Sequence, residues 1–157
     1  MSLSFDSIIS EFLRKISEFE FVNMDEDIRE REVDSYLRAA VADFRKNCKY
    51  DLTAVKDDTE RVFKVDEFED YDADKFSQDI DELVDILSEG MIIQWMKPYL
   101  FRQENLELVI NTRDFTTYSP AELLKSIRAA YTQAKKDYKQ KIYEYSYNHN
   151  DLGVLHI

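Results

Sequence analysis

Apolar residues recur every three or four positions along most of the chain, which is the spacing of one face of an α-helix. This pattern predicts four main helices, over residues 5–18, 26–48, 77–96 and 119–147. Ser4 can cap the first helix, because its hydroxyl can accept an unpaired backbone N–H. The last helix opens with Ser119-Pro120-Ala121-Glu122, a capping box with proline at the first helical position.

Two residues of the third helix qualify this prediction. Pro98 has no backbone N–H to donate, so the helix should end or kink near Lys97, followed by a short helix over residues 99–110. Gly90 lies inside the helix, where it would leave room for the backbone of a neighbouring helix. A kink at Gly90 is the alternative.

The helical spacing disappears over residues 49–75. Short apolar-rich runs lie on either side of the polar segment 56–60, which predicts either a small β-hairpin near 50–66 or a loop. Residues 57–82 hold twelve acids and three bases, a density expected to be solvated or to face a basic partner. Residues 149–157 have apolar side chains without helical spacing, which predicts an extended C-terminal tail.

The composition is that of a folded domain rather than a disordered chain. Apolar residues make up 44% of the 157, and a chain of this length can bury about two-thirds of its unfolded surface. Only two glycines and two prolines occur, which favours long helices over a β-rich fold with many turns. The sequence therefore predicts a mainly α, single-domain bundle over residues 1–157, with about four to five helices and a long C-terminal one.

The charge limits the classes of partner. The formal charge of −12, from 33 acids and 21 bases, argues against nucleic acid or an anionic membrane as a tightly held partner. No apolar run approaches the roughly 20 residues needed to cross a bilayer, and the N-terminus lacks the regions of a signal peptide. Cys48 is the only cysteine, which excludes a disulfide within the chain. We therefore expect a cytosolic or intracellularly assembled protein.

Residues that could carry catalysis or hold a cofactor are scarce. Both histidines, His149 and His156, lie in or beside the tail, where few partners can orient them. Apart from the neighbouring Lys46 and Lys49, nothing around Cys48 suggests a thiol enzyme. The two glycines, Gly90 and Gly153, cannot form a phosphate-binding loop. We therefore expect no enzymatic activity and no cofactor.

The sharpest candidate for a metal site is a run of acids at alternate positions. Asp70, Asp72 and Asp74 resemble the start of a calcium-binding EF-hand loop. The match then fails, because Lys75 stands where the loop needs glycine and Asp81 stands where a bidentate glutamate belongs. A solvated acidic loop is the favoured interpretation, with a calcium-binding module as an alternative.

The last predicted helix is basic, with six bases and two acids over residues 123–147. Bases of this helix and apolar residues of the tail are the predicted interface residues: Lys125, Arg128, Lys135, Lys136, Lys139, Leu152, Val154, Leu155 and Ile157. The acidic stretch 57–82 could pair with the basic helix within one monomer, or with the helix of the next subunit in a head-to-tail assembly.

Five tyrosines also mark the last helix. Tyr131, Tyr138 and Tyr145 recur at heptad spacing, which predicts a packing face with the hydroxyls at its solvated rim. Tyr143 and Tyr147 fall off that stripe and are expected at an interface. A stacking platform for single-stranded nucleic acid is the alternative, because lysines lie between the tyrosines.

Three segments resemble one known family. The segment Glu89-Gly90-Met91-Ile92-Ile93-Gln94-Trp95-Met96-Lys97-Pro98 resembles the helix-Trp-Lys-Pro core of neck proteins from tailed bacteriophages. The run from Thr112 to Ala121 and the end of the long helix, Tyr143 to Tyr147, are similar to the same family. The resemblance covers about residues 26–150.

The resemblance implies a head–tail connector or adaptor, a helical virion protein without catalytic residues. Such a protein forms an oligomeric ring, commonly a dodecamer, between the portal and tail components, and DNA passes through it only as cargo. Its partners are further copies of itself, the portal protein and other neck proteins, which extended C-terminal tails reach. The alternative is a small acidic regulator or inhibitor that binds a basic protein.

Overall fold

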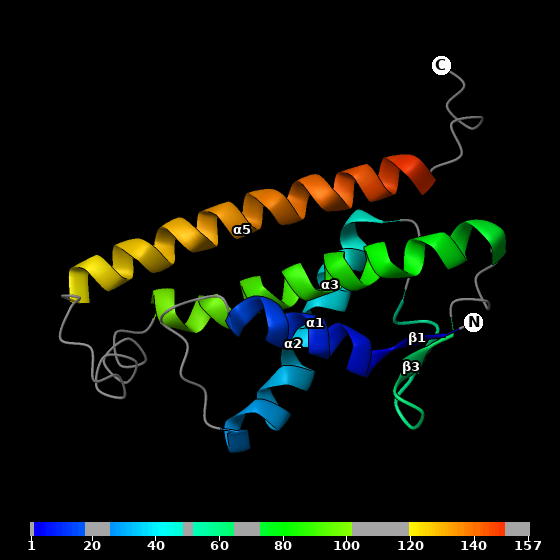
Figure 1. Ribbon diagram of the computed structural model, residues 1–157, viewed down its shortest axis with the longest axis horizontal. Coiled ribbons are helices and arrows are strands. Elements are labelled where there is room, and N and C mark those ends of the chain that lie inside the picture. The colour runs from blue at the N-terminus through cyan, green and yellow to red at the C-terminus, as the bar shows by residue number, and fades with distance from the viewer. Residues whose placement is uncertain (1, 18–25, 49–51, 65–72, 102–119, 150–157) are drawn as a thin grey trace.

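Four helices and a small antiparallel sheet make up the part of the chain that the computed structural model describes, which is residues 2–17, 26–48, 52–64, 73–101 and 120–149 (Figure 1). In chain order the elements are β1 (Leu3–Ser4), α1 (Phe5–Ser17), α2 (Glu26–Asn47), β2 (Lys56–Asp57), β3 (Val62–Phe63), α3 (Ala73–Phe101) and α5 (Pro120–His149). The predicted mainly α fold with a small hairpin is confirmed.

α3 is the central helix of the fold. It packs against α1, α2 and α5, and α5 runs beside it along one edge of the molecule (Figure 1). Because three helices cover it, α3 buries apolar residues on more than one side, including Leu83, Ile86, Met91 and Trp95. Burial of each such side chain stabilises the fold by about 1.5–3 kcal/mol.

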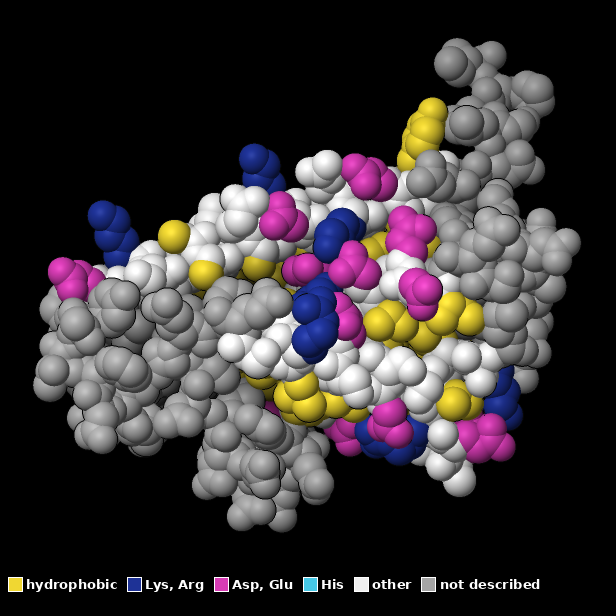
Figure 2. All heavy atoms as spheres, in the orientation of Figure 1, with side chains coloured by type: hydrophobic (Ala, Val, Ile, Leu, Met, Phe, Trp, Pro, Cys, Tyr) yellow, Lys and Arg dark blue, Asp and Glu magenta, His cyan; other side chains and the backbone are white. Residues whose placement is uncertain are grey.

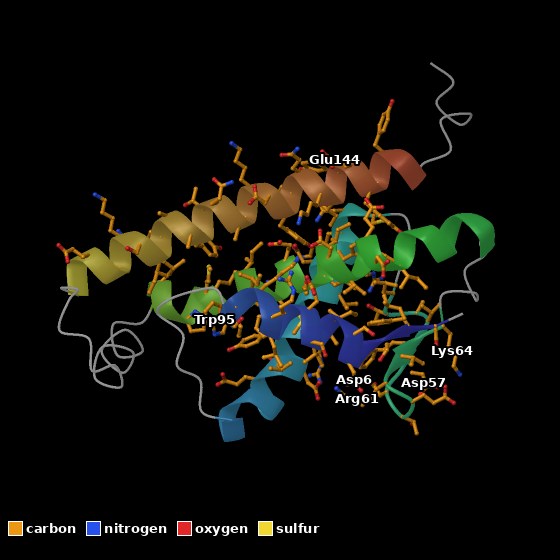
Figure 3. The ribbon with its side chains drawn as sticks, in the orientation of Figure 1. Asp6, Asp57, Arg61, Lys64, Trp95 and Glu144 are labelled. Atoms are coloured by element: carbon orange, nitrogen blue, oxygen red, sulfur yellow. The ribbon has the colours of Figure 1, made fainter. Side chains whose placement is uncertain are left out.

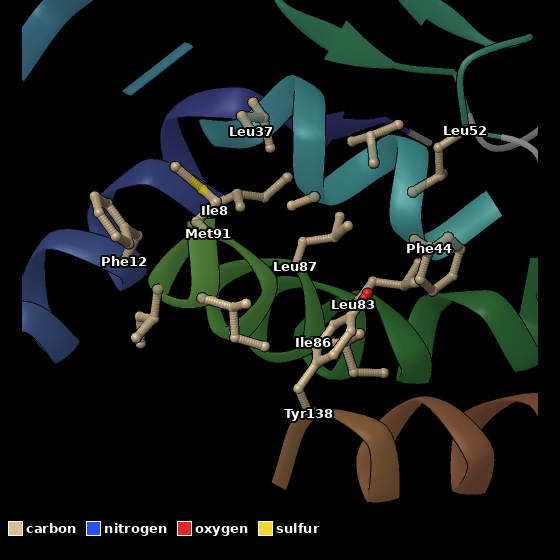
Figure 4. Close-up of a cluster of buried hydrophobic side chains, with 14 of the residues drawn as sticks. Ile8, Phe12, Leu37, Phe44, Leu52, Leu83, Ile86, Leu87, Met91 and Tyr138 are labelled. Carbon is tan, nitrogen blue, oxygen red and sulfur yellow. The ribbon is translucent and has the colours of Figure 1, made fainter. Parts of the chain in front are cut away.

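Apolar side chains from all four helices and the hairpin meet in one core. Figure 4 shows Ile8 and Phe12 of α1 and Leu37 of α2 on one side of α3, and Tyr138 of α5 on the other. Leu52, which precedes the hairpin, is fully buried against the same cluster. The core therefore ties the hairpin region to the helices.

The bounds of α3 differ from the prediction at both ends. The helix begins at Ala73 rather than Ser77, since nothing between these residues breaks a helix. It does not end at Lys97 but continues past Pro98 to Phe101. A proline removes one hydrogen bond, to the residue four positions earlier, and leaves the other backbone hydrogen bonds of the helix in place. The rest of the predicted helix over 99–110 lies outside the described residues.

The hairpin is joined by a third strand that the sequence pattern did not indicate. β3 is the middle strand, antiparallel to both neighbours, so that Phe63 pairs with Lys56 of β2 and with Leu3 of β1. Lys56, expected in the polar tip, instead belongs to a strand. Ser4 then caps α1 as predicted, because its Oγ accepts the Asp6 N–H at 3.2 Å.

The tyrosine stripe of α5 faces the core, as predicted, but the hydroxyls of Tyr138 and Tyr145 do not lie at a solvated rim. The hydroxyl oxygens of Tyr138 and Tyr145 are buried. Burial raises the pKa of the Tyr138 phenol, and the nearby Asp43 carboxylate raises it further. Tyr143 and Tyr147, by contrast, are 61% and 65% exposed.

Among the described residues no helix is long and apolar enough to cross a membrane.

Candidate interaction surfaces

A groove of about 550 Å³ opens between α2 and the hairpin, and we name it the α2–hairpin groove. Its apolar lining comes from three elements: Phe5 of α1, Leu37 and Val41 of α2, and Phe63 of β3. These four side chains are at least 95% buried, and the Phe5 and Phe63 ring centroids lie 4.7 Å apart. The groove therefore has a fixed apolar floor.

The rim of the α2–hairpin groove is basic although the chain is strongly acidic. Two acids, Asp34 and Asp58, line it beside five bases: Arg38, Arg45, Lys46, Lys56 and Arg61. Within the described part of the chain, Arg38 and Lys46 form no ion pair, and both are exposed. An apolar floor with a charged rim is the usual build of a docking surface.

Arg61 is held at the rim by the backbone and by two carboxylates. Its φ of 56° is left-handed, which is costly for a residue with a Cβ. Its carbonyl accepts the Phe5 N–H at 2.9 Å, and its guanidinium bonds both oxygens of Asp34 at 3.0 and 3.2 Å. The hydrogen bond to Asp34 raises the pKa of Arg61 against the opposing effect of burial. Figure 3 shows Arg61 beside Asp6, whose carboxylate lies 3.7 Å away.

Asp57 fixes the turn of the hairpin. Its Oδ1 accepts the N–H groups of Glu60 and Thr59 at 3.0 and 2.9 Å, which is the geometry of an Asx-type turn. Its other oxygen lies 3.2 Å from Lys64 Nζ. The Glu60 N–H, then Lys64, lower the pKa of the Asp57 carboxyl. Lys56 is in turn paired with Asp58 at 2.7 Å.

A second basic surface runs along α5. The five bases predicted there as interface residues are all exposed and fall on one side of the helix, which we name the basic flank of α5: Lys125, Arg128, Lys135, Lys136 and Lys139. None forms an ion pair with another residue of the described ranges. Basic side chains project from α5 at the upper edge of Figure 2.

A smaller groove of about 240 Å³ borders the basic flank of α5, where α5 meets α2 and α3. Lys135 and Lys139 line it from α5, Lys97 from α3 and Asp43 from α2. The Lys135 ammonium lies 5.8 Å from the centre of the Tyr131 ring, a cation–π distance. Three lysines thus face one groove, which suits an acidic partner.

The sixth base of the helix, Lys141, has a different role. Its Nζ lies 2.7 Å from Asp85 and 3.2 Å from Glu89, both on α3. Lys15 of α1 reaches the same two acids at 2.6 and 3.1 Å and bonds the Ser88 hydroxyl at 2.9 Å. We name these five residues the Lys15–Lys141 cluster. They join three helices, and the sequence pattern did not reveal them.

The charges of this cluster balance. Burial alone would raise the pKa of the Asp85 carboxyl, but hydrogen bonds from Lys141 and Lys15 outweigh it and lower that pKa. Burial would lower the pKa of Lys141, but Asp85 and Glu89 raise it. Figure 2 shows basic and acidic side chains gathered in the middle of this face. The cluster therefore stabilises the fold and offers no open charge to a ligand.

Several predicted site residues lie where the structure does not describe them. Two acids of the calcium candidate, Asp70 and Asp72, fall outside the described ranges. So do four predicted interface residues of the tail: Leu152, Val154, Leu155 and Ile157. Asp74 lies in the first turn of α3. Within the described residues no three histidines, cysteines or carboxylates come together to hold a metal.

Comparison with models of protein families, with curated proteins and with solved structures found no match to this chain.

Proposed function

We propose that this chain is a non-enzymatic structural protein of a virion, a head–tail connector or adaptor that forms an oligomeric ring between portal and tail components. The resemblance of residues 89–98 to the core of phage neck proteins supports the proposal. The buried Trp95 and the closely packed Gly90 within that segment give it a structural role in the helical bundle.

The observation that carries the proposal is the basic flank of α5. Five cationic side chains in a chain of net charge −12 stand exposed on one side of one helix, and no described carboxylate neutralises them. Exposed cations on a rigid helix suit an acidic neighbouring protein, because complementary charge steers association and fixes its orientation. The exposed Tyr143 and Tyr147 extend this surface with aromatic area, which is enriched at interfaces.

In this role the partners are further copies of the chain, the portal protein and other neck or tail proteins. DNA passes the ring as cargo. A surplus of acid favours this, since an acidic inner wall repels the phosphate backbone and leaves DNA free to move.

Charge reversal on α5 tests the proposal. The unaltered protein should sediment as a discrete oligomer and bind its portal protein. Lys135→Glu, Lys136→Glu and Lys139→Glu together should weaken portal binding by about tenfold or more. The matched control replaces the same three lysines by arginine, which keeps the charge and should keep binding. A protein that stays monomeric and binds no neck component would contradict the proposal.

A further inference from the structure

We propose that the α2–hairpin groove receives the acidic segment 66–74 of a neighbouring copy of the chain. The inference rests on the proposed function only in requiring that copies assemble. It assigns the contact between copies to the groove and leaves the basic flank of α5 for a different protein.

The groove has the two properties that a short acidic peptide needs. Phe5, Leu37, Val41 and Phe63 give an apolar floor that is already ordered, so a bound side chain costs little rearrangement there. The rim carries five bases and two acids. Asp34 is paired with Arg61 and Asp58 with Lys56, so these two acids are neutralised, whereas Arg38 and Lys46 are exposed and form no ion pair with a described residue.

The chemistry of the groove points to a peptide rather than to a small anion. The cavity of about 550 Å³ is lined along α2 from Asp34 to Lys46, about three turns of helix. The bases come from two elements and are spread along the groove: Arg38, Arg45 and Lys46 from α2, and Lys56 and Arg61 from the hairpin. A ligand must therefore carry several negative charges, with apolar groups between them.

The chain itself contains such a segment. Residues 66–74, Asp-Glu-Phe-Glu-Asp-Tyr-Asp-Ala-Asp, hold six acids and no base, with the aromatic residues Phe68 and Tyr71 between the acids. Aromatic side chains are the usual anchors of an interface, and surrounding acids would meet the basic rim. No other nine residues of the chain combine so many acids with two aromatic anchors.

A contact of this kind is head-to-tail. The groove of one copy takes the segment of a second copy, whose own groove stays open for a third. Such a contact closes into a ring when the rotation between copies allows it. The groove lies between α2 and the hairpin, whereas the basic flank lies on α5, so the two surfaces are separate.

Complementation between two full-length variants tests the inference. The groove variant carries Arg38→Glu and Lys46→Glu, two exposed positions that form no ion pair with described residues. The segment variant carries Glu67→Lys, Glu69→Lys and Asp70→Lys. Circular dichroism checks that both fold, and analytical ultracentrifugation measures assembly. The matched control, Arg38→Lys with Lys46→Arg, keeps the charge and should assemble like the unaltered protein.

Each variant alone should fail to assemble, with the dissociation constant raised by about 30-fold or more. An equimolar mixture should again form oligomers in which the two variants alternate, because the intact groove meets the intact segment and the reversed groove meets the reversed segment. Combining all five substitutions in one chain should restore oligomers, since the charges are exchanged. Oligomers that persist in the groove variant would overturn the inference, as would a mixture that stays monomeric.

The outcome is separable from the proposed function. A groove variant that still assembles and binds the portal would leave the connector role intact while the groove assignment fails. Complementing variants that bind no neck component would support the contact between copies and count against the connector role.

Discussion

Gly90 of α3 lies directly against Ala40 of α2. A Cβ atom built on Gly90 would stand 3.1 Å from the Ala40 Cβ and 3.3 Å from Cε2 of Tyr138 on α5. Three helices thus meet at a residue without a side chain. The predicted role of Gly90 in close helix packing is confirmed.

Gly90→Ala is expected to destabilise the protein by about 1 kcal/mol. Alanine gains about 1 kcal/mol of helix propensity over glycine, but overpacking a core typically costs about 1–3 kcal/mol. The cost should win, because one close neighbour is fixed to the α2 backbone and the other is a buried ring. Urea unfolding measures the difference. Adding Ala40→Gly to Gly90→Ala should recover part of the lost unfolding free energy. If the two substitutions change the unfolding free energy additively, this explanation is contradicted.

Lys15→Met should cost about 1–2 kcal/mol of unfolding free energy. The substitution keeps an apolar stem but removes the ammonium that bonds Asp85, Ser88 and Glu89. The estimate is at the lower end for charged hydrogen bonds, because the Asp85 side chain is 39% exposed. Arg14→Met, at an exposed base of the same helix paired with Glu11, is the control and should change stability by less than about 0.5 kcal/mol. Equal losses in both variants would contradict the assigned role of the cluster.

The Lys15–Lys141 cluster also predicts a pH dependence. The pKa of Asp85 is lower in the folded protein than its usual value, so its ionised form stabilises the fold above the unfolded-state pKa of about 4. That contribution should fade as the pH falls from about 4 towards the lowered pKa. Asp85→Asn should therefore destabilise the protein at neutral pH, and the gap to the unaltered protein should narrow in acid. Thermal unfolding across this range measures it, and a constant gap would argue against the prediction.

Arg61 gives a test of backbone strain. Arg61→Ala and Arg61→Gly both remove the ion pair with Asp34, but only glycine relieves the φ of 56°. The left-handed conformation costs a residue with a Cβ about 1–2 kcal/mol, and glycine avoids this cost. Glycine also gives the unfolded chain more freedom, which lowers the stability of the glycine variant by about 0.4–1 kcal/mol. Arg61→Gly should therefore be about 0.5–1 kcal/mol more stable than Arg61→Ala in chemical denaturation. If the alanine variant is the more stable one, the strain is not real.

The helices could be predicted from the sequence because each carries many apolar residues at regular spacing. Ser4 as a cap and the hairpin near 50–66 were also predictable from local chemistry. The strand β1 was not, since a two-residue strand has no measurable alternation and its partner Phe63 is far away in the chain. The helix α3 was predicted to end or kink near Lys97, and it continues past Pro98, because a proline removes only one backbone hydrogen bond; the kink stays a prediction.

The candidate surfaces were predictable only in part. The exposed bases of α5 follow from their positions on a helix whose inner face is apolar. The α2–hairpin groove does not, since Arg38 and Arg61 come together only when the hairpin packs beside α2. The Lys15–Lys141 cluster could not be predicted from the sequence for the same reason. Its residues come from three helices, and only Asp85 and Glu89 are spaced four residues apart on one helix.

The pairing of Leu3 with Phe63 sets an order of events during synthesis. The first strand leaves the ribosome before α1 and α2 exist, and its partner strand follows only after both helices have been made. The floor formed by Phe5 and Phe63 is therefore finished late, by closing a long loop. A nascent or half-folded copy has no completed groove to offer. A ligand that fits the α2–hairpin groove would therefore distinguish a folded chain from a half-folded one.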